Sequence, residues 1–246
     1  DTQVNGETLL MLACEYGHMD FVRYLVEKGA DVNRRLPELG WTALMAACLN
    51  GHLEVVRYLV AHGADLEAGA STPFLERFKM RDNTYNDYIF NADYKFDATV
   101  DDTGVTPLFW GAIGGHVPVI EYLVKQGCNL NVRTSGHVTP LMMACYYGKL
   151  SIVKFLVAKG ADLHARTTSG ATPLIYASVN DSVSVAAFLI GQGANINTVT
   201  EDGTTALINA CEGGHADMAC YLAAKGADLS VQGKNGKNLI LEAYDG

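Results

Sequence analysis

The stretch TPLMMACYYGKLSIVKFLVAKGAD, residues 139–162, has the pattern of two short helices joined by a tight turn. Thr139 can cap the first helix with its hydroxyl, and Pro140 has no N–H to leave unpaired at the first helical position. Gly148 can take the positive φ with which many helices end. The second helix carries apolar residues at helical spacing and ends before Gly160. The stretch therefore predicts a helix-turn-helix unit.

The same pattern recurs along the chain. Near-copies open at Thr8, Thr42, Thr106, Thr139, Thr172 and Thr205, and a partial last repeat runs from Gly236. Most steps between these threonines are 33 residues, with one of 34 and one of 64. A unit of this size cannot bury its own apolar face, so such repetition predicts stacking of neighbouring units. We predict a single all-α domain over residues 1–246, a solenoid of helix pairs joined by turn or hairpin fingers.

Composition sets the broad class of protein. The chain has 246 residues, of which 49% are hydrophobic, enough for a large core without metal or disulfide. The net charge of −9 argues against nucleic-acid binding. No apolar run is long enough to span a membrane and no signal pattern opens the chain, so we expect a monomeric cytoplasmic protein. The first residue is Asp1 and the last unit stops after one helix, so we expect a trimmed domain or a natural half-repeat cap.

Cysteine and histidine each keep to fixed slots of the repeat. The sixth position after the opening Thr holds Cys14, Cys48, Cys145 and Cys211, with Ala112 and Ser178 in the other copies. A narrow packing slot explains this set, and no ligand spacing for a metal accompanies it. Cys220 replaces a basic residue on the outer helix and should be accessible. Histidines that follow the hairpin Gly are read as structural: His18, His52, His116 and His215.

Two stretches carry a resemblance to a known family. NGETLLMLACEYGHMDFVRYLVEKGADVN (residues 5–33) and GVTPLFWGAIGGHVPVIEYLVKQGCNLN (residues 104–131) resemble ankyrin repeats, with their T-P-L-H-x-A signature. The His of that signature is replaced throughout by Met11, Met45, Phe109, Met142, Ile175 and Ile208. At this position, apolar packing should replace the polar contact that the family's His usually makes to neighbouring turns. The resemblance implies a cupped stack whose concave groove binds a protein or an extended peptide.

The resemblance also implies which side chains face the groove, namely those four, seven and eight residues past each opening Thr. We predict an exposed aromatic patch, because exposed Trp and Tyr are enriched in binding hot spots. The predicted partner-binding residues are Trp110, Met143, Tyr146, Tyr147, Tyr176, Tyr16 and Asn180. The alternative is that Trp110 and Tyr146 fill gaps between helices. For the second helices we predict core packing of the recurrent aromatics Tyr24, Tyr58, Tyr122, Phe155, Phe188 and Tyr221.

Residues 68–103 interrupt the repeat. One interpretation is an eroded repeat that opens at Thr72. The other is an enlarged finger, and the alternation of apolar and polar residues favours it. A long, aromatic-rich insertion is untypical of linker. We predict that it forms one wall of the binding site, or a lid over it, with Tyr88, Phe90, Tyr94 and Phe96 as the wall residues. The alternative is that it only patches an irregular junction between repeats.

The sequence predicts no catalytic, cofactor-binding or metal-binding residues, because the nucleotide-binding, metalloprotease, hydrolase and kinase motifs are absent. The favoured function is a non-enzymatic protein–protein interaction module. The alternative is a targeting or regulatory arm of a larger enzyme, secreted effector or channel whose chemistry lies outside this chain. Four arginines near the fingertips could also form a positive strip for an acidic peptide: Arg34, Arg35, Arg133 and Arg166.

Overall fold

The computed structural model describes residues 3–4, 7–37, 40–70 and 104–230. Residues 71–103 of the predicted insertion, including its four aromatic residues, lie outside the described residues. The partial last repeat lies outside them as well. The chain divides into two compact units, residues 1–135 and 136–246, and each is described by itself.

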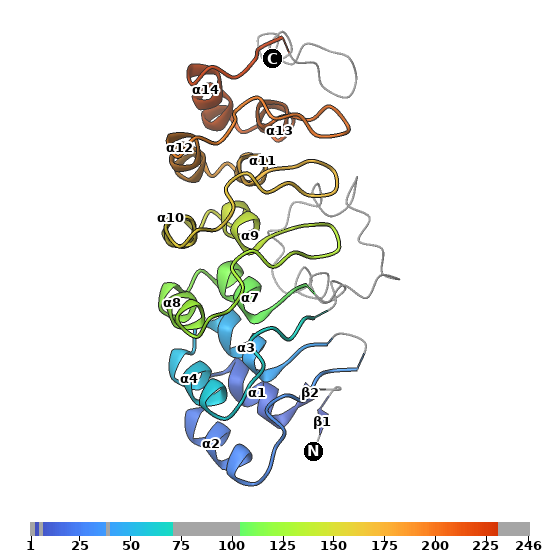
Figure 1. Ribbon diagram of the computed structural model, residues 1–246, viewed down its shortest axis with the longest axis vertical. Coiled ribbons are helices and arrows are strands. Elements are labelled where there is room, and N and C mark those ends of the chain that lie inside the picture. Colours follow the sequence, from blue (N-terminus) through green and yellow to red (C-terminus); the bar gives the residue numbers. More distant parts are fainter. Residues whose placement is uncertain (1–2, 5–6, 38–39, 71–103, 231–246) are drawn as a thin grey trace. The chain divides into compact units, whose positions relative to one another are not determined.

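The first unit contains three described helix pairs and a short N-terminal hairpin. The hairpin joins β1 (Gln3–Val4) to β2 (Glu7–Thr8) in antiparallel register. The pairs are α1 (Leu9–Glu15) with α2 (Met19–Glu27), α3 (Ala43–Asn50) with α4 (Leu53–Ala61), and α7 (Pro107–Gly114) with α8 (Val117–Lys125). Helices α1, α3 and α7 pack side by side as one row, and α2, α4 and α8 form a second row (Figure 1).

The second unit repeats this two-row arrangement. Its pairs are α9 (Pro140–Tyr146) with α10 (Leu150–Ala158), α11 (Pro173–Val179) with α12 (Val183–Gly191), and α13 (Ala206–Glu212) with α14 (Ala216–Ala224). Helix α11 packs between α9 and α13, while α12 contacts α10 and α14 (Figure 1). The predicted all-α fold of stacked helix pairs is therefore confirmed.

The helix boundaries follow the residues that predicted them. The hydroxyls of Thr8, Thr42, Thr139 and Thr205 each accept a hydrogen bond from the N–H three residues later. Thr106 and Thr172 make no such cap, and both precede a proline at the first helical position. The hairpin glycines have positive φ, and in the fifth repeat Asp181 takes their place at φ 52°.

An interlock of histidine and glycine joins consecutive repeats. The Nε2 of His52 lies 2.9 Å from the carbonyl oxygen of Glu15, and the Nε2 of His215 lies 2.8 Å from that of Val179. A Cβ added at Gly51 would lie 2.4 Å from the Nδ1 of His116, so only glycine leaves room for this ring. The structural role predicted for the histidines is confirmed at His52 and His215.

A second tie between repeats uses a side chain that follows the second helix. Asn33 donates from Nδ2 to the Gly63 carbonyl at 2.8 Å, and its Oδ1 accepts from the Asp65 N–H at 2.8 Å. In the second unit, Asn197 makes the same two bonds to Gly226 and Asp228, at 3.4 and 2.8 Å. We call this pair of bonds the Asn clamp. It fixes the loop of one repeat against the next.

The core is apolar and includes most of the cysteines. All six residues that replace the signature His are buried, which confirms the predicted apolar packing there. Cys14, Cys48 and Cys145 are buried in the small-residue slot, Cys211 is half-buried, and Cys220 is exposed as predicted. Burial raises the pKa of the Cys14 thiol to about 12, because the charged thiolate would lose its hydration.

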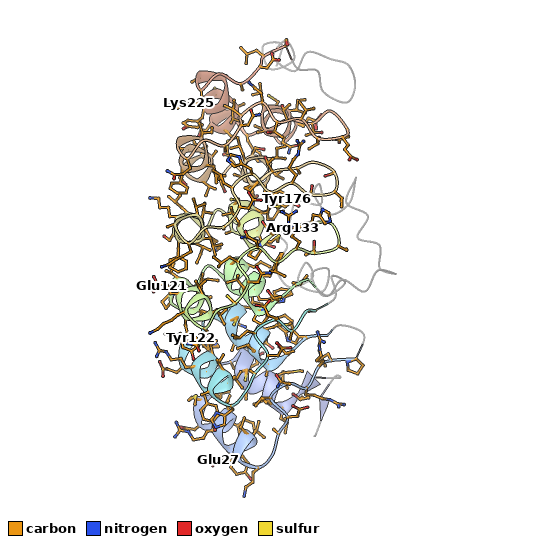
Figure 2. The ribbon with its side chains drawn as sticks, in the orientation of Figure 1. Glu27, Glu121, Tyr122, Arg133, Tyr176 and Lys225 are labelled. Atoms are coloured by element: carbon orange, nitrogen blue, oxygen red, sulfur yellow. The ribbon has the colours of Figure 1, made fainter. Side chains whose placement is uncertain are left out.

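The prediction of core packing for the second-helix aromatics is wrong. Tyr24 is exposed, and the other five members of the set are half-buried. Cations cover several of these rings instead: the Arg57 guanidinium lies 5.2 Å from the ring centre of Tyr122, and the Lys225 Nζ lies 5.7 Å from that of Tyr221. Figure 2 shows Tyr122 on α8 and Lys225 beside α14, in the rows of second helices. These rings form the outer surface of the second helices, and aliphatic residues beside them fill the core.

The interlock predicts unequal effects of two matched glycine substitutions. Gly51→Ala and Gly63→Ala both place a Cβ at positive φ, which costs about 1–2 kcal/mol in each case. A Cβ at Gly63 meets nothing within 4 Å, whereas at Gly51 it collides with the His116 ring. We expect Gly51→Ala to lower the free energy of unfolding by about 1 kcal/mol more than Gly63→Ala, as other overpacking substitutions do. Urea denaturation of both variants measures the difference, and equal losses would contradict the interlock.

Thiol exposure predicts one fast-reacting cysteine. The exposed Cys220 should react with Ellman's reagent at pH 8 at the rate of a free thiol, because its thiolate is accessible. Cys14, Cys48 and Cys145 should react only after unfolding. C220S should remove the fast phase, and C145S should leave it intact. A fast phase that persists in C220S at full amplitude would contradict the burial described here.

Candidate functional site

The predicted groove positions differ sharply in exposure. At the fourth position past the opening Thr, Trp110 is only 1% exposed, and Ala46, Met143 and Tyr176 are also buried. The Trp110 ring meets the Trp41 ring edge-on, with ring centres 4.7 Å apart, and α7 packs along α3. These four side chains are enclosed by the packing around the first helices and are unavailable to a partner, while Leu12 and Asn209 in the same slot are half-buried.

The second unit shows the same burial. Tyr146 is buried, with its ring edge-on to Tyr147 at 5.0 Å and its carbonyl accepting from the Asn180 Nδ2 at 3.2 Å. Figure 2 places Tyr176 among the first helices, where α11 packs between α9 and α13. The prediction of an exposed aromatic patch is therefore wrong for Trp110, Met143, Tyr146 and Tyr176. Burial supports the alternative, in which these side chains fill gaps between helices.

The eighth position past each opening Thr is more accessible than the fourth. Tyr16, Asn50, Asn180 and Gly213 are exposed there, and Gly114 and Tyr147 are half-buried. We call these residues the accessible row, described separately in the two units. Each stands at or next to the end of a first helix, where the chain turns toward the second helix. Three predicted partner-binding residues, Tyr16, Tyr147 and Asn180, belong to this row.

Contacts within the row limit the freedom of its side chains. Tyr147 is held by the Tyr146 ring, and Asn180 is held by the Tyr146 carbonyl. The Tyr16 ring stacks on His18 with centres 6.1 Å apart. A partner that contacts pre-ordered side chains loses less side-chain entropy on binding. The structure thus offers polar and aromatic groups that are accessible and already oriented.

The finger loops of the second unit, which precede the first helices, are bonded to one another. The Thr168 N–H donates to the Gly136 carbonyl at 3.0 Å, and the Glu201 N–H donates to the Ser169 carbonyl at 2.8 Å. Arg166 donates to the carbonyls of Gly170 and Val199, at 3.1 and 2.8 Å. These bonds align successive fingers.

The fingertip arginines have a structural use that the sequence did not predict. Arg35 occupies the same slot of the repeat as Arg166. In the first unit, it donates from Nη2 to the Gly69 carbonyl. Both guanidinium groups therefore bridge to the next loop. This bridging accounts for Arg35 and Arg166 without an acidic ligand. The repeat period could have predicted this structural role, because Arg35, Arg133 and Arg166 all stand 27 residues past an opening Thr.

The described residues offer little for chemistry. Among them, no group of three or more His, Cys, Asp or Glu side chains is placed to hold a metal ion. No helix in the same part of the chain has the length and apolar character to cross a membrane. The positions of Tyr88, Phe90, Tyr94 and Phe96 lie outside the described residues, so their predicted role stays a prediction.

Comparison with known proteins identifies the family. The family model described as ankyrin repeats (3 copies) matches residues 1–70, 83–167 and 141–233. A mouse protein described as protein fem-1 homolog A-like is 30% identical over 122 residues, which are 50% of this chain and 14% of that protein. The chain thus matches only a small part of that relative's length.

A solved structure shares the fold. The crystal structure of the human ASB11 ankyrin repeat domain superposes with a TM-score of 0.74 at 20% sequence identity, over 95% of this chain and 90% of that one. Together with the repeat register and the helix pairs, the family match leads to one conclusion: the chain belongs to the ankyrin repeat family.

Proposed function

We propose that this chain is a protein-recognition module that binds an extended segment of a partner protein along the first-helix ends and finger loops. Ankyrin repeat domains generally mediate protein–protein interaction. The observation that carries the proposal is the accessible row, whose members are exposed or half-buried, whereas Trp110, Met143 and Tyr176 at the fourth position are buried. The proposed contact residues are Tyr147 and Asn180 in the second unit, and Tyr16 marks a separate candidate surface in the first unit.

The chemistry of these residues fits a polypeptide ligand. Tyr147 combines an aromatic face with a phenol, and tyrosine is enriched in binding hot spots. The aligned fingers add exposed hydroxyl groups, such as that of Thr168, that can bond an extended backbone. The net charge of −9 supports a protein partner over nucleic acid. We propose binding by a monomeric chain in the cytoplasm, without catalysis by these repeats.

A second possibility is that the module serves as the targeting arm of a larger protein. The observation that favours it is that the alignment to the fem-1 homolog A-like protein spans 14% of that protein. In that arrangement the same accessible row would recruit the partner, and activity would lie elsewhere in the polypeptide. Both possibilities place the partner on the same residues.

A photo-crosslinking residue tests the placement. Benzoylphenylalanine at position 147 should crosslink a partner from a lysate of the native source, because this side chain stands at the proposed surface. The matched control is the same residue at position 122, a half-buried tyrosine of the second-helix row. The crosslinked partner should be identified by mass spectrometry and then purified. Its affinity for a Tyr147→Ala, Asn180→Ala variant should fall about 10-fold or more, as for hot-spot residues.

The outcome that rejects the proposal is equally specific. A purified partner that binds the double variant with unchanged affinity, and crosslinks from position 122 but not from 147, would place binding on the second helices. The circular dichroism of the double variant should match that of the parent chain, because neither side chain lies in the core.

A further inference from the structure

The second helices of the two units carry different charges, although they fill the same slots of the repeat. With its two cap residues, each second helix spans residues 18–28, 52–62 or 116–126 in the first unit and 149–159, 182–192 or 215–225 in the second. The spans of the first unit hold four Lys or Arg and four Asp or Glu residues. Those of the second unit hold four lysines and one carboxylate, that of Asp217. In a chain with a net charge of −9, the second-helix row of the second unit is therefore locally basic.

The lysines of this row have no acidic partner among the described residues. Lys154, Lys159 and Lys225 form no ion pair there. The Lys154 Nζ lies instead 5.9 Å from the ring centre of Phe188 on the next second helix. The Lys159 Nζ lies 5.7 Å from the ring centre of Phe155. All three lysines are exposed, so their ammonium groups can donate to a carboxylate that arrives from outside.

Helix α12, the middle helix of this row, carries no charged residue. Its buried residues are Val185, Ala186 and Leu189, and the others are half-buried or exposed: Val183, Ser184, Ala187, Phe188, Ile190 and Gly191. A surface helix usually has charged or polar side chains opposite its buried stripe. In the first unit the slot of Ala187 does hold such residues, namely Arg23, Arg57 and Glu121. The solvent side of α12 is therefore unusually apolar for this chain.

Packing leaves one side of α12 uncovered by the described residues. The helix contacts α11, α10 and α14 (Figure 1). Gly191 is exposed, and a Cβ added there would meet nothing within 4 Å. Ala187 and Phe188 stand one turn before Gly191, so they share this side of the helix. Val183 stands one turn before Ala187. We call Val183, Ala187, Phe188 and Gly191 the outer face of α12.

We propose that the outer face of α12 binds an acidic amphipathic helix of a partner protein. The apolar side of that helix would cover the four residues of the outer face. Carboxylates along its two edges would pair with Lys154 and Lys159 on the α10 side and with Lys225 on the α14 side. The small Ala187 and Gly191 allow the two helix axes to approach to about 8–10 Å, the usual packing distance. This surface is separate from the accessible row, so the proposal does not depend on the proposed function.

Three other occupants fit less well. An extended strand needs free backbone groups to pair with, whereas the backbone N–H and C=O groups of a helix are already bonded within it. A second copy of this chain, joined through its own outer face, would bring lysines against lysines, and such like-charge contacts oppose binding. An anionic membrane would attract the lysines, but the net charge of −9 opposes approach of the whole chain to such a surface.

Two defined peptides test the proposal on the full chain. Each has about 18 residues, or about five helical turns, with Leu and Ala along one face. One peptide has Glu along both edges of that face, and the other has Lys at the same positions. We expect the Glu peptide to bind saturably in a fluorescence anisotropy titration and the Lys peptide not to bind. The affinity of the Glu peptide should fall as salt is added, because salt screens exposed charge pairs.

Variants of charge and of shape locate the bound peptide. The Lys154→Glu, Lys159→Glu variant should bind the Glu peptide about tenfold or more weakly, because like charges would then face each other. The matched control is Lys125→Glu, the same change at an exposed lysine of the first unit, and it should leave the affinity unchanged. Gly191→Gln should weaken binding by a similar factor by blocking the approach of the helix. Its midpoint of unfolding should hold or rise, because a Cβ there meets nothing and Gln favours the helix more than Gly.

Several results would overturn the proposal. These are no saturable binding of the Glu peptide up to about 1 mM, equal binding of the two peptides, and unchanged affinity in Gly191→Gln. Equal losses in Lys125→Glu and in the double lysine variant would show a general charge effect and would also overturn it. Co-sedimentation with phosphatidylserine vesicles covers the membrane: vesicle binding that is lost in the double lysine variant, without peptide binding, would assign the face to lipid instead. The Tyr147→Ala, Asn180→Ala variant should bind the Glu peptide as the parent chain does, which separates this test from that of the proposed function.

Discussion

Contact between consecutive helix pairs is the interaction on which this structure depends, because no pair can bury its apolar residues alone. The chain reinforces that contact with polar ties at both ends of the second helix. At the start, a histidine bonds to a carbonyl at the end of the first helix of the preceding repeat, and a glycine gives its ring space. After its end, an asparagine bonds the next loop. Apolar burial supplies the attraction, and these directional bonds fix the register.

The sequence was most informative where a rule of local geometry applied. Capping threonines, hairpin glycines and the apolar stripe together located every described helix, because each acts within a few residues of the chain. Even Asp181, the exception among the hairpin glycines, takes the positive φ that the position requires. The roles of His52 and the small-residue cysteines also followed from their recurrence at one slot, since only shared packing repeats in that way.

The candidate site was predicted less well, for a physical reason. A residue's slot can be counted from the sequence, but its exposure depends on how closely the neighbouring helix approaches. The fourth position past the opening Thr predicts that Trp110 faces the groove, yet α3 packs against its helix and Trp41 against its ring. The reverse error occurred at Tyr122, where a cation and solvent share the ring that was assigned to the core. Residue type did not decide either case.

The accessible row has a consequence for how such a protein changes over generations. Its members lie beside the helix ends and contribute little to the buried core, whereas four of the fourth-position residues, Ala46, Trp110, Met143 and Tyr176, are buried. A substitution at Asn50 can therefore change the accessible row while leaving the packing between repeats intact. On the proposed mode of binding, ligand choice and maintenance of the scaffold depend on separate codons, so one can drift without harming the other.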